Sequence, residues 1–312
     1  EFVDRAEVSA FIGEMADRHG FERGELRSLF KRATPRPEAI RILSQARKEP
    51  LPWPKHRAIF LNAARIEGGL EFWARNSDAL ARAKREYGVP EEVIVAIIGV
   101  ETRYGANAGA HPMFDTLATL AFDYPPRADF FRGELEQFLL LAREEKVNPR
   151  ELTGSYAGAM GIPQFIASSY RKYARDFNAD GRRDLLHDEV DAIGSVAHYL
   201  SAFGWEADHP IATRVSVRDG ALHSLPVGNV VPEKSVAELR SLGVIAVNTV
   251  PGEWSATIME LETESGPEYW LGFRNFYVIT RYNRSIAYAM SVYQLAQALK
   301  SARLESASGA IQ

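Results

Sequence analysis

The sequence predicts a mainly α protein of the α+β class that carries one small β-containing segment. Apolar residues recur at helical spacing through about the first two-thirds of the chain. From residue 206 the pattern changes to alternation with turn signals such as Asp219-Gly220 and Gly266-Pro267, and the aromatic run Tyr269–Ile279 is typical of a strand. Helical spacing returns at 284–300.

Two helices are expected at the start of the chain. The apolar face of residues 5–19 consists of Val8, Phe11, Ile12 and Met15. Gly20 follows this helix as a stop signal, and a second helix over about 24–32 ends before Pro35. Prolines at alternate positions cannot continue a helix, so the segment 49–54 is expected to be an extended connection.

Further helices are expected over 57–86, with a break at Gly68-Gly69, and over 131–146. The last residues, 301–312, lack bulky side chains and are expected to form a flexible tail. The five tryptophans are expected in the core or at domain interfaces rather than as platforms for sugars.

Composition and motifs exclude several classes of function. The 312 residues carry a formal net charge of −4, so the chain lacks the broad basic field that nucleic-acid binding requires. Cysteine is absent, which excludes disulfides, thiol nucleophiles and thiolate metal sites. The sequence has no H-E-x-x-H, G-x-S-x-G or nucleotide-binding glycine motif, and no organic cofactor is expected.

No apolar run approaches the ~18 residues that would span a membrane. The chain begins with Glu1-Phe2 rather than Met, and no signal-peptide core follows. We therefore expect a mature or truncated form from which an export signal or lipid anchor has been removed.

The most informative helix is expected over 90–104. Pro90 suits its first turn, Gly105 suits its C-terminal cap, and the eight residues Val93–Val100 carry no polar side chain, which predicts a buried helix. Glu101 is the first polar residue after this run and shares the face of Ile98. Apolar surroundings and the negative end of a helix both raise the pKa of a carboxyl group. Glu101 is therefore a candidate general acid for a glycosidic oxygen; the alternative is a solvated helix-end glutamate, or one paired with Arg103.

Four blocks along the chain carry a resemblance to a known family: Glu101–Gly105, Gly154–Phe165, Asp191–Val196 and Asn275–Ser285. Together they resemble the lytic murein transglycosylase B family, which has soluble and membrane-bound forms. The resemblance implies a lysozyme-like helical core and cleavage of the β-1,4 bond between N-acetylmuramic acid and N-acetylglucosamine in peptidoglycan. The product is a 1,6-anhydromuramoyl end, and the single acid and base of the family maps to Glu101.

The resemblance also implies a division of the chain. A helical N-terminal domain is expected over 1–80, the catalytic core over 81–205 together with 274–300, and a small β-containing domain over 206–273, before the tail at 301–312. A hydrolytic muramidase and a non-catalytic peptidoglycan-binding scaffold are the alternatives.

A lone carboxylate is sufficient for the transglycosylase reaction, whereas ordinary glycosidases use two. Glu101 would protonate the leaving oxygen and then take the proton of the C6 hydroxyl as that oxygen closes on C1. An internal nucleophile reacts at high effective molarity, so no water has to be positioned.

The family match also implies residues that bind substrate. Ser155 and Gln164 would contact the substrate or orient the acid, and small residues at 157–161 would let a sugar approach the backbone. Residues that match positions lining the substrate groove are Tyr199, Tyr282, Asn283 and Tyr288. Without the match, the block around Pro163 reads as a loop that leads into a helix.

The sequence departs from the family at one point. The family often has paired arginines after Tyr-Pro, whereas only Arg127 remains in Tyr124–Arg127. Recognition of the peptide stem is therefore expected to be weaker or different.

The segment Asp176–Gly181 reads D-x-N-x-D-G, like the first half of an EF-hand calcium loop. Its expected oxygen donors are Asp176, Asn178, Asp180 and the backbone carbonyl of Arg182. The twelfth position is His187, an unsuitable ligand for calcium, but the family closes a longer loop on a later aspartate. That residue maps to Asp191, with Asp188 as the alternative, and a structural Ca²⁺ is expected; the competing interpretation is an Asp-Gly turn without metal.

The resemblance places the protein in the periplasm, either soluble or anchored to the outer membrane through a removed N-terminal segment. Its expected partners are peptidoglycan glycan strands and no nucleic acid. Proteins of cell-wall synthesis or division are candidate partners.

Overall fold

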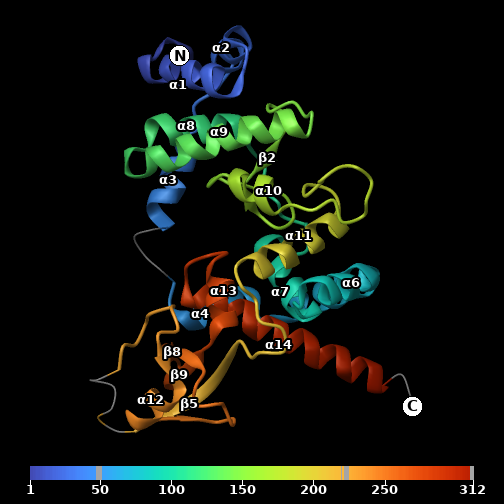
Figure 1. Cartoon of the computed structure of the whole chain (residues 1–312), viewed down its shortest axis with the longest axis vertical. Coiled ribbons are helices and arrows are strands. Elements are labelled where there is room, and N and C mark those ends of the chain that lie inside the picture. The colour runs from blue at the N-terminus through green and yellow to red at the C-terminus, as the bar shows by residue number, and fades with distance from the viewer. Residues whose placement is uncertain (47–50, 219, 221–224, 310–312) are drawn as a thin grey trace. The chain divides into compact units, whose positions relative to one another are not determined.

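The computed structural model describes residues 1–46, 51–218, 220 and 225–309 (Figure 1). The chain divides into two compact units. Unit 1 contains Glu1–Pro50, Asn107–Ala174 and Ala179–His187, and unit 2 contains Leu51–Ala106, Arg175–Asn178 and Asp188–Gln312. The chain passes between the two units several times.

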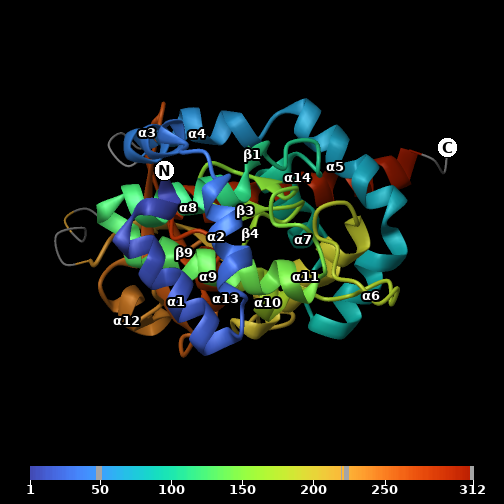
Figure 2. The same ribbon diagram turned by 90° about the horizontal axis from the view of Figure 1, so that it is seen from above.

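Unit 1 is helical, with two very short antiparallel strand pairs: β1 with β2, which α8 and α9 separate in the chain, and the hairpin of β3 and β4. Its elements are η1 (Phe2–Asp4), α1 (Ala6–His19), α2 (Arg23–Lys31), α3 (Pro37–Ala46), β1 (His111–Pro112), α8 (Met113–Asp123), η2 (Pro125–Arg127), α9 (Ala128–Glu144), β2 (Thr153–Gly154), β3 (Ala159–Met160), β4 (Phe165–Ile166) and α10 (Ala167–Tyr173). Helices α1 and α2 are neighbours (Figure 2), and α8 packs on α9. The core is aromatic: Phe11, Phe30 and Phe122 meet edge to face, with ring centroids 6.0 to 6.1 Å apart.

Unit 2 combines a helical part with a sheet. Its elements are α4 (Trp53–Phe60), α5 (Ala63–Arg75), α6 (Ser77–Tyr87), α7 (Glu91–Thr102), α11 (Glu189–Ala202), β5 (Ala212–Val217), β6 (Lys234–Ser235), α12 (Val236–Ser241), β7 (Val244–Ala246), β8 (Ser255–Thr263), β9 (Gly266–Gly272), α13 (Arg274–Thr280) and α14 (Ile286–Gly309). Helix α7 contacts α5, α6, α11 and α14, so it is central to the helical part.

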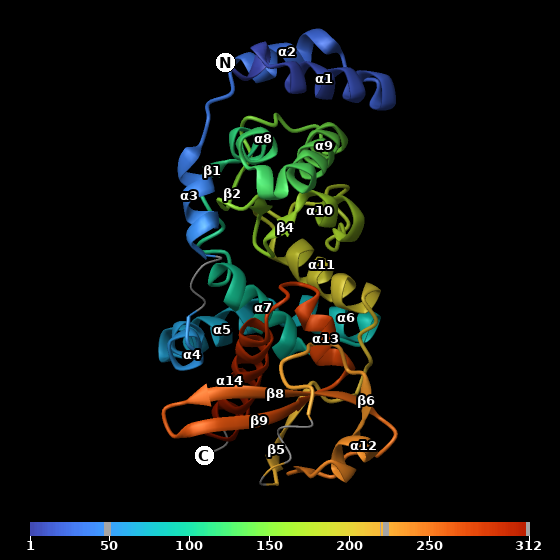
Figure 3. The same ribbon diagram turned by 90° about the vertical axis from the view of Figure 1, so that its left-hand side faces the viewer.

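The sheet of unit 2 has the strand order β6-β8-β9-β5-β7, and all of its pairs are antiparallel. Strands β8 and β9 form a long hairpin (Figure 3), whose register runs from Thr257 opposite Gly272 to Thr263 opposite Gly266. One face of the sheet and α12 enclose an apolar cluster that includes Ile258 and Leu271. The fold class expected from the sequence, mainly helical with a small β-containing part, is confirmed.

Three expected helix boundaries are wrong. The chain is already helical at Trp53 and Pro54, because proline is tolerated in the first turn of a helix; residues 49 and 50 lie outside the described residues. Helix α5 runs unbroken through Gly68 and Gly69, and the breaks in 57–86 fall instead at residues 61–62 and at Asn76. Helix α10 begins at Ala167, so Pro163 lies in a turn rather than opening a helix.

The run Tyr269–Ile279 is only partly a strand. Strand β9 ends at Gly272, and Arg274–Thr280 form helix α13, because burial of Phe276, Val278 and Ile279 outweighs their β propensity. At the C-terminal end, α14 continues to Gly309 where the sequence suggested a tail, while residues 310–312 lie outside the described residues. None of the described helices is long and apolar enough to cross a membrane.

Candidate active site

Helix α7 is buried and apolar along most of its length and carries the carboxyl group of Glu101 near its C-terminal end. All of the residues Val93–Val100 are buried, as the sequence predicts. Glu101 follows them in the last turn, next to the buried Thr102, and keeps partial solvent exposure. The burial of α7 on every side explains why this stretch has no polar face.

The side chain of Glu101 is held by a tyrosine from another helix. The hydroxyl of Tyr288, on α14, donates a hydrogen bond of 2.5 Å to Glu101 Oε1. Burial raises the pKa of Glu101 to about 7, while the Tyr288 hydrogen bond acts in the opposite direction. Within the described residues, Glu101 forms no ion pair with Arg103, which is exposed. The carboxyl group is therefore available in both protonation states near neutral pH.

Three tyrosines predicted to bind substrate lie together at this carboxyl group. The rings of Tyr282 and Tyr288 are nearly parallel, with centroids 6.5 Å apart, and the Tyr199 ring lies 4.8 Å from that of Tyr282. Burial raises the pKa values of Tyr282 and Tyr288 well above the usual range, so both hydroxyls stay neutral and can donate hydrogen bonds. Tyr199 itself is fixed by donating to the carbonyl of Arg281 at 2.7 Å.

The backbone makes a tight turn directly after α7, two residues beyond Glu101. Arg103, Tyr104 and Gly105 have φ values of 53°, 63° and 89°, so three consecutive residues are left-handed. Arg103, rather than the expected Gly105, is the capping residue of α7. The Tyr104 ring is buried, and its hydroxyl donates to the carbonyl of Arg65 at 2.7 Å.

Glycines make room for the Tyr104 ring. A Cβ atom on Gly99 would lie 2.6 Å from the Tyr104 hydroxyl oxygen, and one on Gly69 would lie 2.5 Å from it. This close packing gives the physical reason for Gly68-Gly69 inside α5, which the sequence had suggested as a break in the helix.

Sequence reasoning missed Arg65. This arginine is 7% exposed, and its guanidinium donates to the carbonyls of Gly99 and Ile59. It therefore satisfies a carbonyl in the last turns of α7, close to Glu101 in the chain. No local sequence pattern distinguishes a buried arginine of a helix from an exposed one.

Ser155 lies in unit 1 and organises a turn. Its hydroxyl oxygen accepts hydrogen bonds from the backbone N–H groups of Ala157 at 3.3 Å and Ala159 at 3.1 Å. A Cβ atom on the preceding Gly154 would lie 2.3 Å from the Ala159 carbonyl oxygen. At Gly154 the small residue is required because the chain approaches itself closely.

Gln164 also belongs to unit 1, between β3 and β4. Its backbone is left-handed, with φ 52°, and its side-chain amide nitrogen donates to the carbonyls of Ala108 at 3.0 Å and Gly161 at 2.9 Å. Both donated bonds fix the orientation of the amide group.

The two other residues with predicted roles in binding are exposed. Arg127 ends η2, and its guanidinium lies over the rings of Phe130 and Phe131, 4.1 and 5.1 Å from their centroids. Asn283 lies in the turn between α13 and α14, directly after Tyr282. The structure thus brings Glu101, Tyr199, Tyr282 and Tyr288 together in unit 2, while Ser155, Gln164 and Arg127 belong to unit 1.

The candidate calcium loop lies between α10 and α11, as expected. Asp191 Oδ1 accepts hydrogen bonds from the backbone N–H groups of Phe177 at 2.7 Å and Asn178 at 3.3 Å. Asp188 caps α11 and accepts a bond of 2.8 Å from the Asn178 amide. Asp188 and Asp191, the two candidates for closing the loop, are therefore both hydrogen-bonded to the start of the loop.

The later part of the loop belongs to unit 1, where the Arg182 N–H donates to Asp180 Oδ1 at 2.9 Å. In the part of the chain that the structure describes, no three His, Asp or Glu side chains are grouped closely enough to hold a metal ion. The donors are nonetheless the hard oxygen atoms that calcium requires.

Comparison with known proteins identifies similar chains. Residues 4–297 match the family described as "Transglycosylase SLT domain". The sequence is 41% identical to membrane-bound lytic murein transglycosylase B of Escherichia coli K12, over 98% of this chain and 86% of that protein.

Solved structures give the same result. Catenated lytic transglycosylase SltB1 of Pseudomonas aeruginosa has a TM-score of 0.94 at 46% identity, covering 97% of this chain and 100% of that one. Escherichia coli Slt35 in complex with calcium has a TM-score of 0.90 at 41% identity, covering 97% and 96%. Pseudomonas aeruginosa SltB3 in complex with NAG-anhNAM-pentapeptide has a TM-score of 0.82 at 30% identity, covering 94% and 79%.

Proposed function

The chain belongs to the lytic transglycosylases with an SLT domain and is an enzyme that acts on peptidoglycan, and from this premise we propose that Glu101 alone carries both of its proton transfers. The observation that supports the proposal is the carboxyl group at the end of α7, whose pKa burial raises to about 7. A group with this pKa is protonated often enough to act as an acid and ionised often enough to act as a base.

In the first step, neutral Glu101 donates its proton to the oxygen between N-acetylmuramic acid and N-acetylglucosamine, and the bond from C1 to this oxygen breaks. The acetamido group of the muramic acid stabilises the positive charge at C1. In the second step, the Glu101 carboxylate takes the proton of the C6 hydroxyl while that oxygen bonds to C1. The result is a 1,6-anhydro ring and a reprotonated acid. The NAG-anhNAM group in the SltB3 complex supports this product.

Tyr288 orients the acid in this mechanism. Because its hydroxyl donates to Oε1, the transferable proton resides on Oε2 of the neutral carboxyl group. The same hydrogen bond stabilises the carboxylate that forms after the first step.

The other residues divide into binding and positioning roles. Tyr199, Tyr282 and Asn283 bind sugar rings and their polar groups beside Glu101, supported by the cluster of rings around Tyr288. Gln164 binds an N–H or O–H group of the substrate through Oε1, whereas Ser155 acts mainly by holding its turn. The exposed Arg127 meets the carboxylates of the peptide stem.

A structural Ca²⁺ is part of the proposal. The residues that would hold it are Asp176, Asn178 and Asp180 through their side chains and Arg182 through its backbone carbonyl, with Asp191 as the closing residue and Asp188 as the alternative. The calcium complex of Slt35 supports it, as does the reach of Asp191 to the loop. The ion would stabilise the segment that precedes α11, the helix that carries Tyr199. It would take no part in bond cleavage.

We place the protein in the periplasm, where its substrate lies, either free or anchored by a segment outside this sequence. Its partners are peptidoglycan glycan strands, with proteins of cell-wall synthesis or division as further candidates. The membrane-bound form of the Escherichia coli relative supports an anchored version.

The experiment is digestion of purified sacculi followed by mass analysis of the released fragments. The wild-type enzyme should release 1,6-anhydromuramoyl ends, and Glu101→Gln should release none while keeping the circular dichroism spectrum of the wild type. Reducing muramic ends would show a hydrolase, and activity that survives in Glu101→Gln would remove Glu101 from the mechanism.

A further inference from the structure

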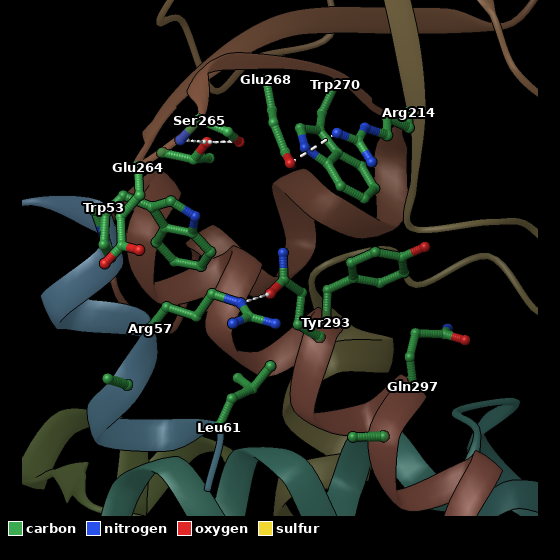
Figure 4. A pocket seen from close by; sticks show the side chains of 15 residues that line it. Trp53, Arg57, Leu61, Arg214, Glu264, Ser265, Glu268, Trp270, Tyr293 and Gln297 are labelled. Atoms are coloured by element: carbon green, nitrogen blue, oxygen red, sulfur yellow. Dashed lines mark hydrogen bonds and ion pairs between the residues drawn. The ribbon is translucent and has the colours of Figure 1, made fainter.

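A pocket in unit 2 that Glu101 does not line has residues suited to binding a ligand. It has a volume of about 810 Å³ and lies between α4, α14 and the β8–β9 hairpin (Figure 4). Trp53 comes from α4, Tyr293 and Gln297 come from α14, and Trp270 comes from β9. A volume of several hundred Å³ is typical of sites for small molecules or for parts of polymers.

This pocket is distinct from the surroundings of Glu101. Tyr288, which contacts Glu101, and Gln297, which lines the pocket, are nine residues apart on α14. At 3.6 residues per turn they project from opposite sides of the helix, about 13 Å apart along its axis. A ligand in the pocket would therefore leave the carboxyl group accessible.

The charged groups of the pocket balance one another. They are two arginines and two glutamates: Arg57, Arg214, Glu264 and Glu268. Arg214 pairs with Glu268 at 2.7 Å, and Arg57 donates to the side-chain oxygen of Gln294 at 2.7 Å. Such a lining provides no net field for an anion and favours a polar, uncharged ligand.

Aromatic rings and amide groups complete the lining. The rings of Trp270 and Tyr293 meet at 76° with centroids 6.0 Å apart, and thus form a corner. Trp270 Nε1 is buried and has no hydrogen-bond partner among the described residues, while Gln297 is exposed. Aromatic faces with nearby amides bind the apolar faces of sugars and their hydroxyl and acetamido groups.

We propose that this pocket is a non-catalytic binding site for an N-acetylated sugar of a glycan strand. This proposal rests on the proposed function in one respect: the proposed function identifies peptidoglycan as the natural ligand. Attachment of a second stretch of the polymer makes each encounter with the active site effectively intramolecular, which raises the apparent affinity for sacculi.

The direct test is an NMR titration of the Glu101→Gln protein with tri-N-acetylchitotriose, a neutral sugar probe that this variant cannot cleave. The indole N–H signal of Trp270, identified by its loss in Trp270→Phe, and the Gln297 side-chain amide should shift with a common saturation curve. If these signals stay unchanged while probe is added to saturation of the active-site signals, the proposal is wrong. Shifts caused by the dipeptide L-Ala-D-Glu, but not by the sugar, would likewise overturn it.

A pelleting assay with sacculi tests the consequence for the polymer. In the Glu101→Gln background, Trp270→Phe together with Gln297→Ala should weaken binding by roughly tenfold, the loss of about 1.4 kcal/mol. Gln45→Ala, an exposed glutamine of α3 outside the pocket, is the matched control and should bind normally. Equal binding by the double variant and the control would contradict the proposal.

The two proposals fail in different ways. Reducing ends in the digestion of sacculi would overturn the mechanism of Glu101 and leave the sugar titration interpretable. Absence of shifts at Trp270 and Gln297 would overturn the second site and leave the catalytic proposal intact.

Discussion

Tyr288 donates a 2.5 Å hydrogen bond to Glu101 although 187 residues separate them in the chain. The bond joins α14 to α7, and it opposes the effect of burial on the carboxyl group. Glu101 is thus held between an apolar environment that favours its neutral form and a donor that favours its anion. Burial and the Tyr288 hydrogen bond together set the pKa of Glu101, and therefore its ability to donate a proton and then accept one.

Replacement of Tyr288 by Phe should raise the pKa of Glu101, because the hydrogen bond that stabilises the carboxylate is lost. We expect the alkaline limb of the pH–rate profile to move to higher pH and kcat to fall. The profile of kcat between pH 5 and 9 measures this, with Tyr87→Phe on α6 as the control that should keep the wild-type profile. A limb that stays in place would show that Tyr288 does not tune the acid.

The pH dependence of stability should reveal the same group. The pKa of Glu101 is raised from 4.5 to about 7 in the folded protein, so folding favours the protonated form. This stabilisation is fully present below pH 4.5 and is lost as pH rises through about 7. Relative to Glu101→Gln, the wild type should therefore lose up to about 3 kcal/mol of unfolding free energy between pH 4 and 8.

Urea unfolding of the two proteins at several pH values measures this difference. Because glutamine does not titrate, every other group cancels in the comparison. A constant difference across the range would mean that Glu101 ionises with an ordinary pKa, and would remove the physical basis for the acid.

Gly99→Ala should be harmful although alanine is the better helix former. The new Cβ atom would lie 2.6 Å from the Tyr104 hydroxyl oxygen, so the ring must move. We expect a loss of about 1–3 kcal/mol in unfolding free energy, as for other overpacked sites, and a lower kcat. Gly133→Ala on α9 is the matched control: it has no atom within 4 Å of its Cβ position and should gain about 0.5–1 kcal/mol. A Gly99 variant that behaved like the control would show that the Tyr104 ring is loosely held.

Calcium should raise the melting temperature of the wild type. At a concentration of 100 Kd a ligand of the folded state adds about 2.7 kcal/mol, so the increment is measurable even at weak affinity. Asp191→Asn should abolish the increment caused by calcium, whatever its effect in the absence of the ion, while Asp129→Asn, which changes a fully exposed carboxylate, should keep it. An unmoved melting temperature in excess Ca²⁺ would exclude the metal site.

The sequence predicted helix α7 well, because a run of eight apolar residues specifies burial without help from the rest of the chain. Glu101 could be named because it is the first polar group after that run. Its tyrosine partner could not be derived from local pattern, since the contact joins residues far apart in the chain, and only the family resemblance pointed to Tyr288.

The errors in the fold have a common physical origin in tertiary packing. Gly68 and Gly69 looked like a helix break, but they are small so that the Tyr104 ring fits against α5. The segment Arg274–Thr280 has β-forming residues, but its helical form buries Phe276. Arg65 was missed because a buried cation on a helix has no distinct sequence pattern.

The reversal after α7 makes the enzyme vulnerable at a place that the substrate need not touch. Each non-glycine residue in a left-handed conformation costs about 1–2 kcal/mol, and both Arg103 and Tyr104 adopt one. The buried Tyr104 ring, packed against Gly69 and Gly99, holds this turn in place. The geometry at the end of α7 therefore depends on two glycines whose own chemistry plays no part in the reaction.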